Sequence, residues 1–383
     1  MTVTGKDLNV GIVHDWLPTL GGAEKVVQQL TDLYPNSEIY TLFNFLDEKD
    51  NNFIGSQKIN VSPLNKLPFV EKYYRNLLLQ CTRQIEQFDV SRHDVVISSS
   101  AALAKGVITS VDQPHICYMH SPARYAWDLS HEYINDIQGV LAPIKRAIAK
   151  ELIYRYRFWD MRSVNTIDAI ISNSNFIKKR IEKVYKRSSH VIYPPVDIEK
   201  YALNTCTRDE YYVTASRLVA YKKIDLIVKA FSLNKARKLV VIGDGPELAN
   251  IKALATPNVE FVGYQEQDSM VQLIQNAKAF VFAAFEDFGI VPVEAQACGT
   301  PVICFSKGGT SETVIDVNDS ITPTGVYFHE QHERHIENAI TQFESQIDKF
   351  SEIACRHNAE RFSQKRFRSE ISSFVNNMMN RNT

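Results

Sequence analysis

Residues 279–305 read AFVFAAFEDFGIVPVEAQACGTPVICF. The apolar run at 279–283 predicts a buried strand, and the run at 302–305 predicts another. Between them, Pro292 suits the first turn of a helix, because its missing N–H has no helical partner to lose there, and we expect that helix over 292–298. A strand, a helix and a strand in this order indicate two parallel strands joined by a right-handed crossover.

The same alternation continues outward along the chain. Further strands are predicted at 10–14, 94–98, 115–119, 169–172, 212–215, 238–243 and 259–262. Further helices are predicted at 23–33, 174–185 (with Ser174 as N-cap), 223–235, 269–276 and 364–376. The expected fold class is therefore α/β, with two doubly wound Rossmann-like domains facing a central cleft, where ligands of such sheets bind.

The length of 383 residues suits two domains. Pro194 and Pro195 stop regular structure between the two series. We place an N-terminal domain at 1–195, a C-terminal domain at 196–360, and a last helical segment at 361–383 that returns to the N-terminal domain.

Composition excludes several classes of protein. The chain is 44% hydrophobic and 23% charged, which is typical of a folded globular protein. Its formal net charge of −1 gives no reason to expect a nucleic-acid partner. The cysteines are scattered without any C-x-x-C, so we expect a reducing compartment and neither disulfides nor zinc; they are Cys81, Cys117, Cys206, Cys298, Cys304 and Cys355.

The N-terminal residues show no charged leader followed by an apolar run, so no signal peptide is expected. The longest apolar stretches, such as 280–285, are far shorter than a membrane span. We therefore expect a cytoplasmic protein.

Two glutamates flank the predicted helix in the opening segment. Glu286 is expected in the loop after the strand at 279–283, and Glu294 in the first helical turn. Carboxylates of this kind can accept hydrogen bonds from sugar hydroxyls, and Gly289 between them allows close backbone approach. The alternative is that both glutamates are simply exposed to solvent.

Two cations follow another strand, in the segment SRLVAYKKID at 216–225. Arg217 comes directly after the strand at 212–215, and Lys222 stands five residues further on. A guanidinium fork and a point charge together suit a diphosphate. The alternative is a solvated basic loop.

Gly21 and Gly22 stand between the first strand and its helix. Glycines there let a ligand approach the free amides of the helix N-terminus, which attract anions, although a Gly-Gly turn at such a place is also common without a ligand. His120, after the strand at 115–119, could bond a ligand hydroxyl as a neutral imidazole or be a satisfied structural histidine. No D-x-D motif occurs, so no metal and no other cofactor is expected.

The region 140–190 is basic, with 12 Lys and Arg against 4 acidic residues. Aromatic residues alternate with arginines in LIYRYRFW at 152–159. The pattern is compatible with a patch for anionic lipid or a lipid-diphosphate acceptor, and equally with a solvated helix face. The candidate patch residues are Lys145, Arg146, Lys150, Arg155 and Arg157.

Taken together, these segments resemble the retaining family-4 glycosyltransferases of GT-B architecture over nearly the whole chain. The motifs that carry the resemblance are EDFGIVPVE followed by A-x-A-x-G-x-P-V-I, then SRLVAYKKID, VIGDGPEL and SKGGTSETV. The N-terminal segments HDWLPTLGGAEKV and HICYMHSPARYAWD are similar to the mannosyltransferases of bacterial O-antigen and exopolysaccharide assembly.

The resemblance implies a role for each matching residue. Gly22, next to Gly21, matches the glycine whose loop lies by the diphosphate of the sugar donor, and Arg217 and Lys222 match the pair that neutralises that diphosphate.

Three further positions of the motif match the part of the sugar donor beyond its diphosphate. Glu294 matches the ribose-binding glutamate. Glu286 matches the glutamate that contacts the sugar, beside the amides of Phe288, Gly289 and Ile290. His120 matches the histidine near the sugar's 6-hydroxyl and the reacting centre.

The implied reaction moves a sugar, with mannose from GDP-mannose favoured, onto a polyprenyl-diphosphate-linked saccharide or oligosaccharide acceptor. It proceeds without a metal, at the inner face of the cell membrane, in bacterial surface polysaccharide synthesis. The N-terminal domain would bind the acceptor and the C-terminal domain the nucleotide sugar. The chain departs from the family pattern at Lys223, where glycine is common, and at Pro194-Pro195, where Asn-Gly is common.

Other functions stay open. The same family includes enzymes with UDP-sugar donors, and the same architecture includes sugar phosphorylases and UDP-sugar epimerases. An NAD-dependent oxidoreductase could use two doubly wound domains, but HDWLPTLGGAE after the first strand lacks the G-x-G-x-x-G pattern. A catalytically inactive scaffold of a polysaccharide assembly complex is the alternative that is not an enzyme.

Overall fold

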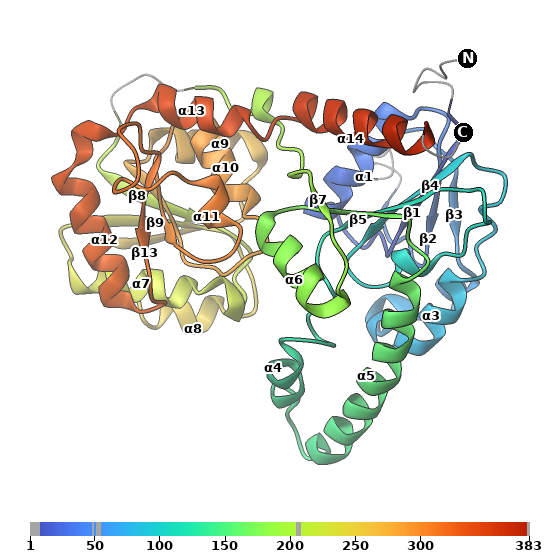
Figure 1. The fold of residues 1–383 in the computed structure, drawn as a ribbon. Coiled ribbons are helices and arrows are strands. Elements are labelled where there is room, and N and C mark those ends of the chain that lie inside the picture. Colours follow the sequence, from blue (N-terminus) through green and yellow to red (C-terminus); the bar gives the residue numbers. More distant parts are fainter. Residues whose placement is uncertain (1–7, 48–49, 51–54, 204–207, 381–383) are drawn as a thin grey trace. The chain divides into compact units, whose positions relative to one another are not determined.

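The computed structural model describes residues 8–47, 50, 55–203 and 208–380. The chain divides into two compact units (Figure 1). The first unit comprises residues 1–195 together with 367–383, and the second comprises residues 196–366. The chain therefore passes from one unit to the other twice, once after Pro195 and once after Arg366.

The first unit contains a seven-stranded parallel sheet in the order β3-β2-β1-β4-β5-β6-β7. Its strands are β1 Val10–His14, β2 Glu38–Thr41, β3 Ile59–Val61, β4 Val95–Ser100, β5 His115–Met119, β6 Ala169–Ser172 and β7 His190–Val191. Its helices are α1 Gly22–Leu33, α3 Leu78–Ile85, α4 Ser130–Asn135, α5 Ala142–Val164 and α6 Asn175–Tyr185, and α14 Gln364–Met379 joins them from the end of the chain.

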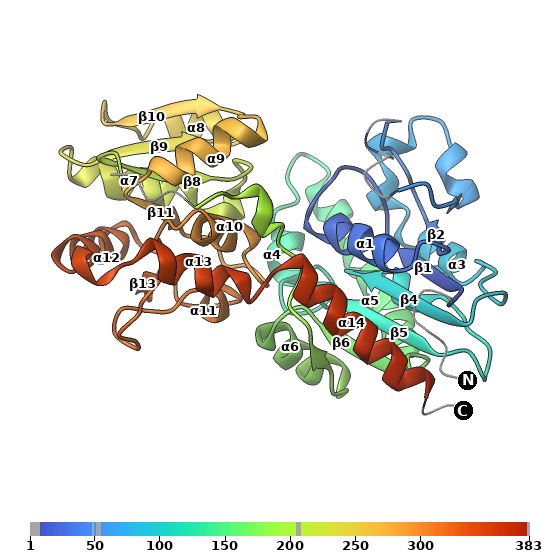
Figure 2. The same cartoon turned by 90° about the horizontal axis from the view of Figure 1, so that it is seen from above.

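Helices cover both faces of this sheet. Alternate residues of β1, such as Ile12, pack with α1 and α14 on one face, and Val13 packs with α3 and α5 on the other. Figure 2 shows α1 and α14 lying side by side over the strands. The central strands are buried along their whole length, which explains why they are continuous apolar runs in the sequence.

A buried carboxylate ties the end of β1 to the turn after β4. Asp15 accepts hydrogen bonds from the backbone amides of residues 101–104 at 2.5–2.9 Å. The same turn leads to Lys105, whose ammonium group lies 2.6 Å from the carboxylate of Asp160 in α5. Both side chains of this ion pair are almost completely buried, and the indole of Trp127 and the hydroxyl of Tyr185 also donate to Asp160.

The second unit contains a six-stranded parallel sheet in the order β10-β9-β8-β11-β12-β13. Its strands are β8 Tyr211–Ala215, β9 Lys238–Ile242, β10 Val259–Gly263, β11 Ala279–Phe282, β12 Val302–Phe305 and β13 Gly325–Phe328. Its helices are α7 Ile224–Leu233, α8 Leu248–Lys252, α9 Gln267–Asn276, α10 Ile290–Ala297, α11 Thr310–Thr313, α12 Glu333–Ser345 and α13 Glu352–Glu360. One face packs against α7, α8 and α12, and α10 packs against α13 on the other (Figure 1).

The α/β class and the parallel sheets are confirmed, and four strands (β1, β5, β6 and β12) match the predicted bounds to the residue. Ser174 caps α6 as expected, its hydroxyl accepting from the Ile177 amide at 3.1 Å. The strands β2, β3, β7 and β13 were missed, and all of these except β2 lie at the edge of a sheet. The helix α10 starts two residues earlier than predicted, so Glu294 is its fifth residue and lies beyond the first turn, contrary to our expectation.

The predictions on cysteines and membrane spans can also be set beside the structure. The five described cysteines are free thiols and all are buried, while Cys206 lies outside the described residues. Within the described segments, no helix combines the length and the apolarity that crossing a bilayer requires.

The Lys105–Asp160 ion pair predicts a large stability effect. Replacing Lys105 with Met leaves a buried charge without its partner, and we expect the free energy of unfolding of the first unit to fall by about 3–5 kcal/mol. All three tryptophans, Trp16, Trp127 and Trp159, lie in the first unit, so tryptophan fluorescence during urea unfolding reports on it.

The matched control for this substitution is Arg155→Met. It removes an exposed ion pair with Glu151 on the same helix, and we expect a loss of at most about 1 kcal/mol. Equal losses for the two variants would mean that the buried pair does not hold α5 to the sheet.

Candidate active site

In the second unit, the predicted cationic and acidic residues come together at the carboxyl ends of β8 and β11. The ammonium group of Lys222 forms an ion pair with the carboxylate of Glu286, and the two side chains are only 14% and 19% exposed. Lys222 also lies over the ring of Phe282, with the nitrogen 5.9 Å from the centroid. Arg217 follows β8 directly, and its side chain is exposed.

Two glycines fix the loop that carries Arg217. A Cβ on Gly243 would lie 1.9 Å from the carbonyl oxygen of Ser216, and one on Gly245 would lie 2.3 Å from that of Leu218. The Leu218 amide donates to the carbonyl of Asp244 at 2.9 Å. The VIGDGPEL motif, which the sequence offered only as a supporting feature, therefore holds the Arg217 loop in place.

The loop that carries Glu286 is held in a similar way. Gly289 caps α10 at φ +85°, a backbone conformation that favours glycine. The amide of Gly309 donates to the carbonyl of Glu286 at 2.8 Å, and a Cβ on Gly308 would lie 2.4 Å from that oxygen. The SKGGTSETV motif thus supports the backbone of the acidic loop.

The side chains of Glu294 and Phe288, two other predicted residues in this unit, are both buried. Glu294 is buried and lies beside the hydroxyl of Tyr201, which also accepts from the side-chain amide of Gln267 at 3.1 Å. Burial and the Glu294 carboxylate raise the pKa of Tyr201 well above its usual value. Phe288 is a core residue that packs against Phe362, so only its backbone is suited to ligand contact.

The backbone at Lys223, one of the two departures from the family pattern, has the conformation expected of a glycine. It has φ +57° and precedes α7 as the N-cap residue. Glycine adopts this left-handed conformation without steric cost, whereas other residues do so rarely. The lysine therefore adopts the turn conformation that a glycine would favour.

In the first unit, a polar chain connects four residues at the carboxyl ends of β1, β4 and β5. His14 Nε2 lies 3.6 Å from Glu24 Oε1, and His14 Nδ1 lies 3.1 Å from both the carbonyl oxygen and the hydroxyl oxygen of Ser99. The hydroxyl of Ser99 lies 2.8 Å from Nε2 of His120. The sequence predicted His120 but not its three partners, although His14 and Glu24 both stand in the quoted segment HDWLPTLGGAEKV.

The glycine turn contacts the same polar chain. The Gly21 amide donates to Oε2 of Glu24 at 2.9 Å. This amide is therefore not free to face an anion, contrary to our expectation. The helix itself leaves the amides of its first residues unused, so Gly22 and Ala23 are the candidate N–H donors at this end of α1.

The pKa shifts of these groups follow from burial and charge. Burial alone would lower the pKa of His14, but the nearby carboxylate of Glu24, with the charge of Asp15, raises it above its ordinary value. Burial would raise the pKa of Glu24, but His14 lowers it. Burial, with the charge of His14 as a smaller cause, lowers the pKa of His120 to about 4, so His120 is neutral near pH 7.

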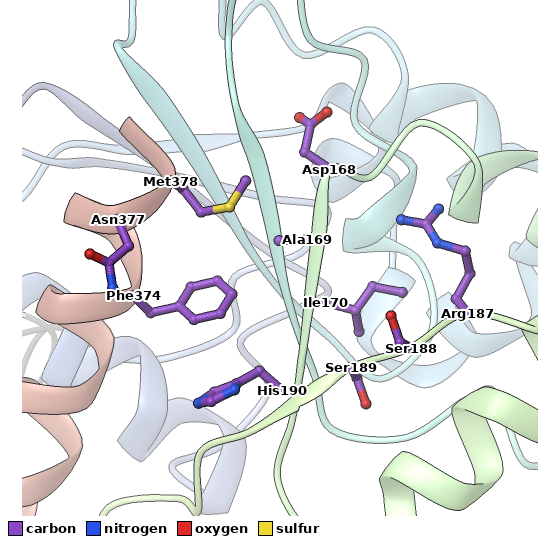
Figure 3. Close-up of a pocket in the computed structure, with 10 residues that line it drawn as sticks. All are labelled: Asp168, Ala169, Ile170, Arg187, Ser188, Ser189, His190, Phe374, Asn377 and Met378. Atoms are coloured by element: carbon purple, nitrogen blue, oxygen red, sulfur yellow. The ribbon is translucent and has the colours of Figure 1, made fainter. Parts of the chain in front are cut away.

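A hollow of about 490 Å³ lies elsewhere in the first unit (Figure 3). Asp168 and Ala169 line it at the amino end of β6, residues 187–190 at that of β7, and Phe374, Asn377 and Met378 of α14 lie across from them. The guanidinium of Arg187 already donates to the carbonyls of Val164 and Ile167 at 2.9 and 2.7 Å. Because ligands of parallel sheets bind at the carboxyl ends of strands, this hollow is not the candidate active site.

The basic residues predicted as a patch are not equivalent. Arg146 donates to the carbonyls of Asn135 and Ile137, and Arg157 donates to the carbonyl of Ala126. Arg155 pairs with Glu151 on the same helix. Of the five, only Lys145 and Lys150 have no such partner among the described residues, so the patch is smaller than the sequence suggested.

Comparisons with known proteins bear on the family and the fold. The family model described as "Glycosyltransferase Family 4" matches residues 20–200, and the one described as "Glycosyl transferases group 1" matches residues 196–360. The alpha-1,3/1,6-mannosyltransferase ALG2 of Kluyveromyces lactis is 25% identical over 305 residues, covering 66% of this chain and 57% of that protein.

Two further similarities differ in extent, one local and one over nearly the whole chain. The GDP-mannose-dependent monoacylated alpha-(1-6)-phosphatidylinositol monomannoside mannosyltransferase of Corynebacterium glutamicum is 36% identical over 114 residues, 26% of this chain and 30% of that protein. The chain thus matches less than two thirds of the length of these relatives. The crystal structure of Anabaena HepE in complex with UDP has a TM-score of 0.69 at 17% identity, covering 96% of this chain and 99% of that one.

The two parallel-sheet units and these similarities define a glycosyltransferase of GT-B architecture. The two family models together span residues 20–360, and the chain belongs to glycosyltransferase family 4.

Proposed function

We propose that this glycosyltransferase transfers mannose from GDP-mannose, with retention of configuration, to a lipid-linked saccharide or oligosaccharide acceptor. The observation that carries the proposal is the Lys222–Glu286 ion pair, with Arg217 in the loop after β8 that leads to Lys222. It combines cations for a diphosphate with a carboxylate for sugar hydroxyls at the end of the sheet where ligands bind.

In this proposal the second unit binds the sugar donor. Arg217 forms a bidentate contact with the diphosphate, and Lys222 adds a compact positive charge. Glu286 accepts hydrogen bonds from sugar hydroxyls, next to the backbone of Phe288, Gly289 and Ile290.

Glu294, in the same unit, binds the ribose hydroxyls. To do so, the carboxylate either gives up its hydrogen bond with the hydroxyl of Tyr201 or accepts from that hydroxyl and the ribose hydroxyls together.

The first unit contributes His120 and the amino end of α1. A neutral His120 can exchange a hydrogen bond with a sugar hydroxyl near the reacting carbon. The amides of Gly22 and Ala23, with the positive end of the helix dipole, favour a nearby phosphate.

The reaction then needs one bond exchange. The bond between the anomeric carbon and the diphosphate oxygen breaks, and the bond from the acceptor oxygen forms on the same face. The acceptor proton passes to the departing diphosphate, whose charge Arg217 and Lys222 stabilise; such electrostatic stabilisation is usually the largest contribution to catalysis. No metal is required in this scheme.

The choice of mannose rests on the relatives: two of them are named mannosyltransferases, and one is named as GDP-mannose-dependent. A UDP-sugar is the second candidate donor, because the fold neighbour from Anabaena was solved with UDP.

Of the predictions that follow from the proposed function, the first separates these sugar donors. We expect GDP and GDP-mannose, but not UDP, UDP-glucose or NAD, to raise the melting temperature. A ligand at 100 times its Kd adds about 2.7 kcal/mol and shifts melting by several degrees. The shift, measured by differential scanning fluorimetry, should persist in EDTA. Stabilisation by UDP-sugars alone would replace the mannose proposal, and stabilisation by NAD alone would overturn the transferase site.

The second prediction concerns Lys222. Replacing it with Ala should lower kcat about 10²- to 10³-fold, because one preorganised charge facing the departing diphosphate is lost. The control is Lys223→Gly, which removes the neighbouring charge and relaxes the positive φ, and should leave turnover close to that of the wild type. Turnover of radiolabelled sugar donor measures both. Full activity of the Lys222 variant would exclude its proposed role.

We also propose that a lipid-linked acceptor is met at a membrane surface by the α4–α5 hairpin, residues 130–164. The hairpin extends away from the sheet of the first unit (Figure 1). Its tip exposes Val140 (98%), Leu141 (58%), Ile144 (59%) and Ile148 (55%), with Lys145 and Lys150 on the same helix. Exposed apolar side chains flanked by lysines fit an anionic lipid surface.

The membrane proposal predicts that charge reversal weakens vesicle binding when it is made in the hairpin and much less when it is made elsewhere. Each lysine near an anionic surface contributes about 1 kcal/mol, so Lys145→Glu with Lys150→Glu should weaken binding to phosphatidylcholine vesicles containing phosphatidylglycerol by at least about 30-fold. Vesicle co-sedimentation measures this. The control pair, Lys178→Glu with Lys179→Glu on α6, makes the same charge change and should have a much smaller effect. Equal losses would contradict a docking role of the hairpin.

A further inference from the structure

The polar chain Glu24–His14–Ser99–His120 is more elaborate than a single hydrogen bond to His120 would require. His14 is buried, and Glu24 is 10% exposed in its side chain. Burying a charged pair is costly unless its geometry and hydrogen bonds compensate. The arrangement of atoms along the chain shows what the pair can do.

Both ring nitrogens of His14 face groups that accept hydrogen bonds. Nδ1 lies 3.1 Å from the carbonyl oxygen of Ser99, which can only accept. Nε2 faces the carboxylate of Glu24, which accepts and does not donate when ionised. Each nitrogen therefore needs a proton, which makes His14 an imidazolium paired with a carboxylate.

The proton on His14 Nδ1 determines the direction of the hydrogen bond between Ser99 and His120. It also points toward the hydroxyl oxygen of Ser99 at 3.1 Å. When that oxygen accepts from His14, its own hydrogen is available for His120 Nε2, 2.8 Å away. A neutral His120 that accepts at Nε2 must carry its proton on Nδ1, a nitrogen without a hydrogen-bond partner among the described residues.

We propose that Glu24 and His14 are positioning residues that act through Ser99 to fix the tautomer of His120, so that Nδ1 presents an N–H. This inference rests on the proposed function for its catalytic meaning, because only a sugar donor at His120 would use that N–H. The tautomer itself is a property of the polar chain alone.

Loss of one proton from His14 would reverse the direction of the hydrogen bonds along the polar chain. A neutral His14 keeps its remaining proton on Nε2, because a bare Nε2 would face the full negative charge of Glu24 with no donor. A bare Nδ1 faces the neutral Ser99 carbonyl, and the Ser99 hydroxyl beside it can donate to that nitrogen. Nδ1 then accepts from the Ser99 hydroxyl, and Ser99 in turn accepts from His120 Nε2. His120 would present a bare Nδ1, which accepts instead of donating. One proton on His14 therefore decides which hydrogen bond His120 can offer a ligand.

The charged groups around His14 favour the protonated form. Glu24 faces it from α1, Asp15 is its neighbour at the end of β1, and His120 faces it from β5. The two carboxylates raise the pKa of His14, and His120 stays neutral because its own pKa is about 4. The imidazolium form should thus predominate below the raised pKa of His14 and be lost as the pH rises through it.

Nitrogen-15 NMR of histidine-labelled protein tests the tautomer without any assay of activity. His120 is assigned by the signal lost in His120→Asn. In the wild type at pH 6.5 we expect a protonated Nδ1 and an unprotonated Nε2, with the reverse pattern as His14 titrates at higher pH. A wild-type His120 protonated on Nε2 at pH 6.5, or a pattern that ignores the titration of His14, would overturn the inference.

Variants add a test of the route. Glu24→Gln should lower the pKa of His14 and shift His120 toward the Nε2-protonated form, while Asp32→Asn, a charge change elsewhere on α1, should not. In a Ser99→Ala background, Glu24→Gln should no longer change the His120 pattern. An unchanged pattern in Glu24→Gln alone would overturn the coupling.

Kinetics then connects the tautomer to the reaction. We expect Glu24→Gln to lower kcat about 10- to 100-fold, the range found when an outer hydrogen-bond partner of a metal-bound histidine is removed, with little change in the KM of the sugar donor. Wild-type kcat should fall as the pH rises through the pKa of His14, and this dependence should vanish in Ser99→Ala. The NMR result with an unaffected kcat would refute the role in transfer, and absence of any transfer would refute the proposed function while the tautomer stands.

Discussion

The carboxylate of Asp15 is the contact on which the first unit depends. By holding the backbone amides of residues 101–104, it joins the end of β1 to the turn after β4. That turn carries Lys105 to its buried partner on α5. Because β1 and β4 are fixed in this way at their carboxyl ends, His14 and Ser99 meet within hydrogen-bond distance. The amide of His120, after β5, donates to the carbonyl of Ser100 at 2.8 Å, and His120 Nε2 lies within hydrogen-bond distance of the Ser99 hydroxyl. The contacts that stabilise the first unit therefore also position the residues of its candidate site.

The second unit reaches a comparable precision by another route. There, glycines allow loop backbones to touch: Gly243 and Gly245 against the loop of Arg217, and Gly308 and Gly309 against that of Glu286. The first unit uses buried charges where the second uses close backbone packing. Both place their functional side chains after parallel strands, which is where such sheets leave loops free to vary.

The sequence predicts the central strands well, because strands buried on both faces are unbroken apolar runs. Two strands on one side of the first sheet escape this pattern: Glu38–Thr41 and Ile59–Val61 are short and partly polar. At the site, residue types and motif order indicate Lys222 and Glu286 individually, but their pairing joins residues 64 positions apart and depends on the sheet. The arginines of α5 show the same limit, since a local surplus of charge does not tell which guanidinium groups bind carbonyl oxygens of their own unit.

The return of the chain to the first unit has a consequence for biosynthesis. Phe367, Ile371 and Val375 of α14 belong to the same buried cluster as β1 and α1. While the chain emerges from the ribosome, the earlier residues of that cluster have been made long before these three. The first unit therefore acquires its full core only after the whole second unit has been translated, and its apolar face under α14 needs protection from aggregation until then.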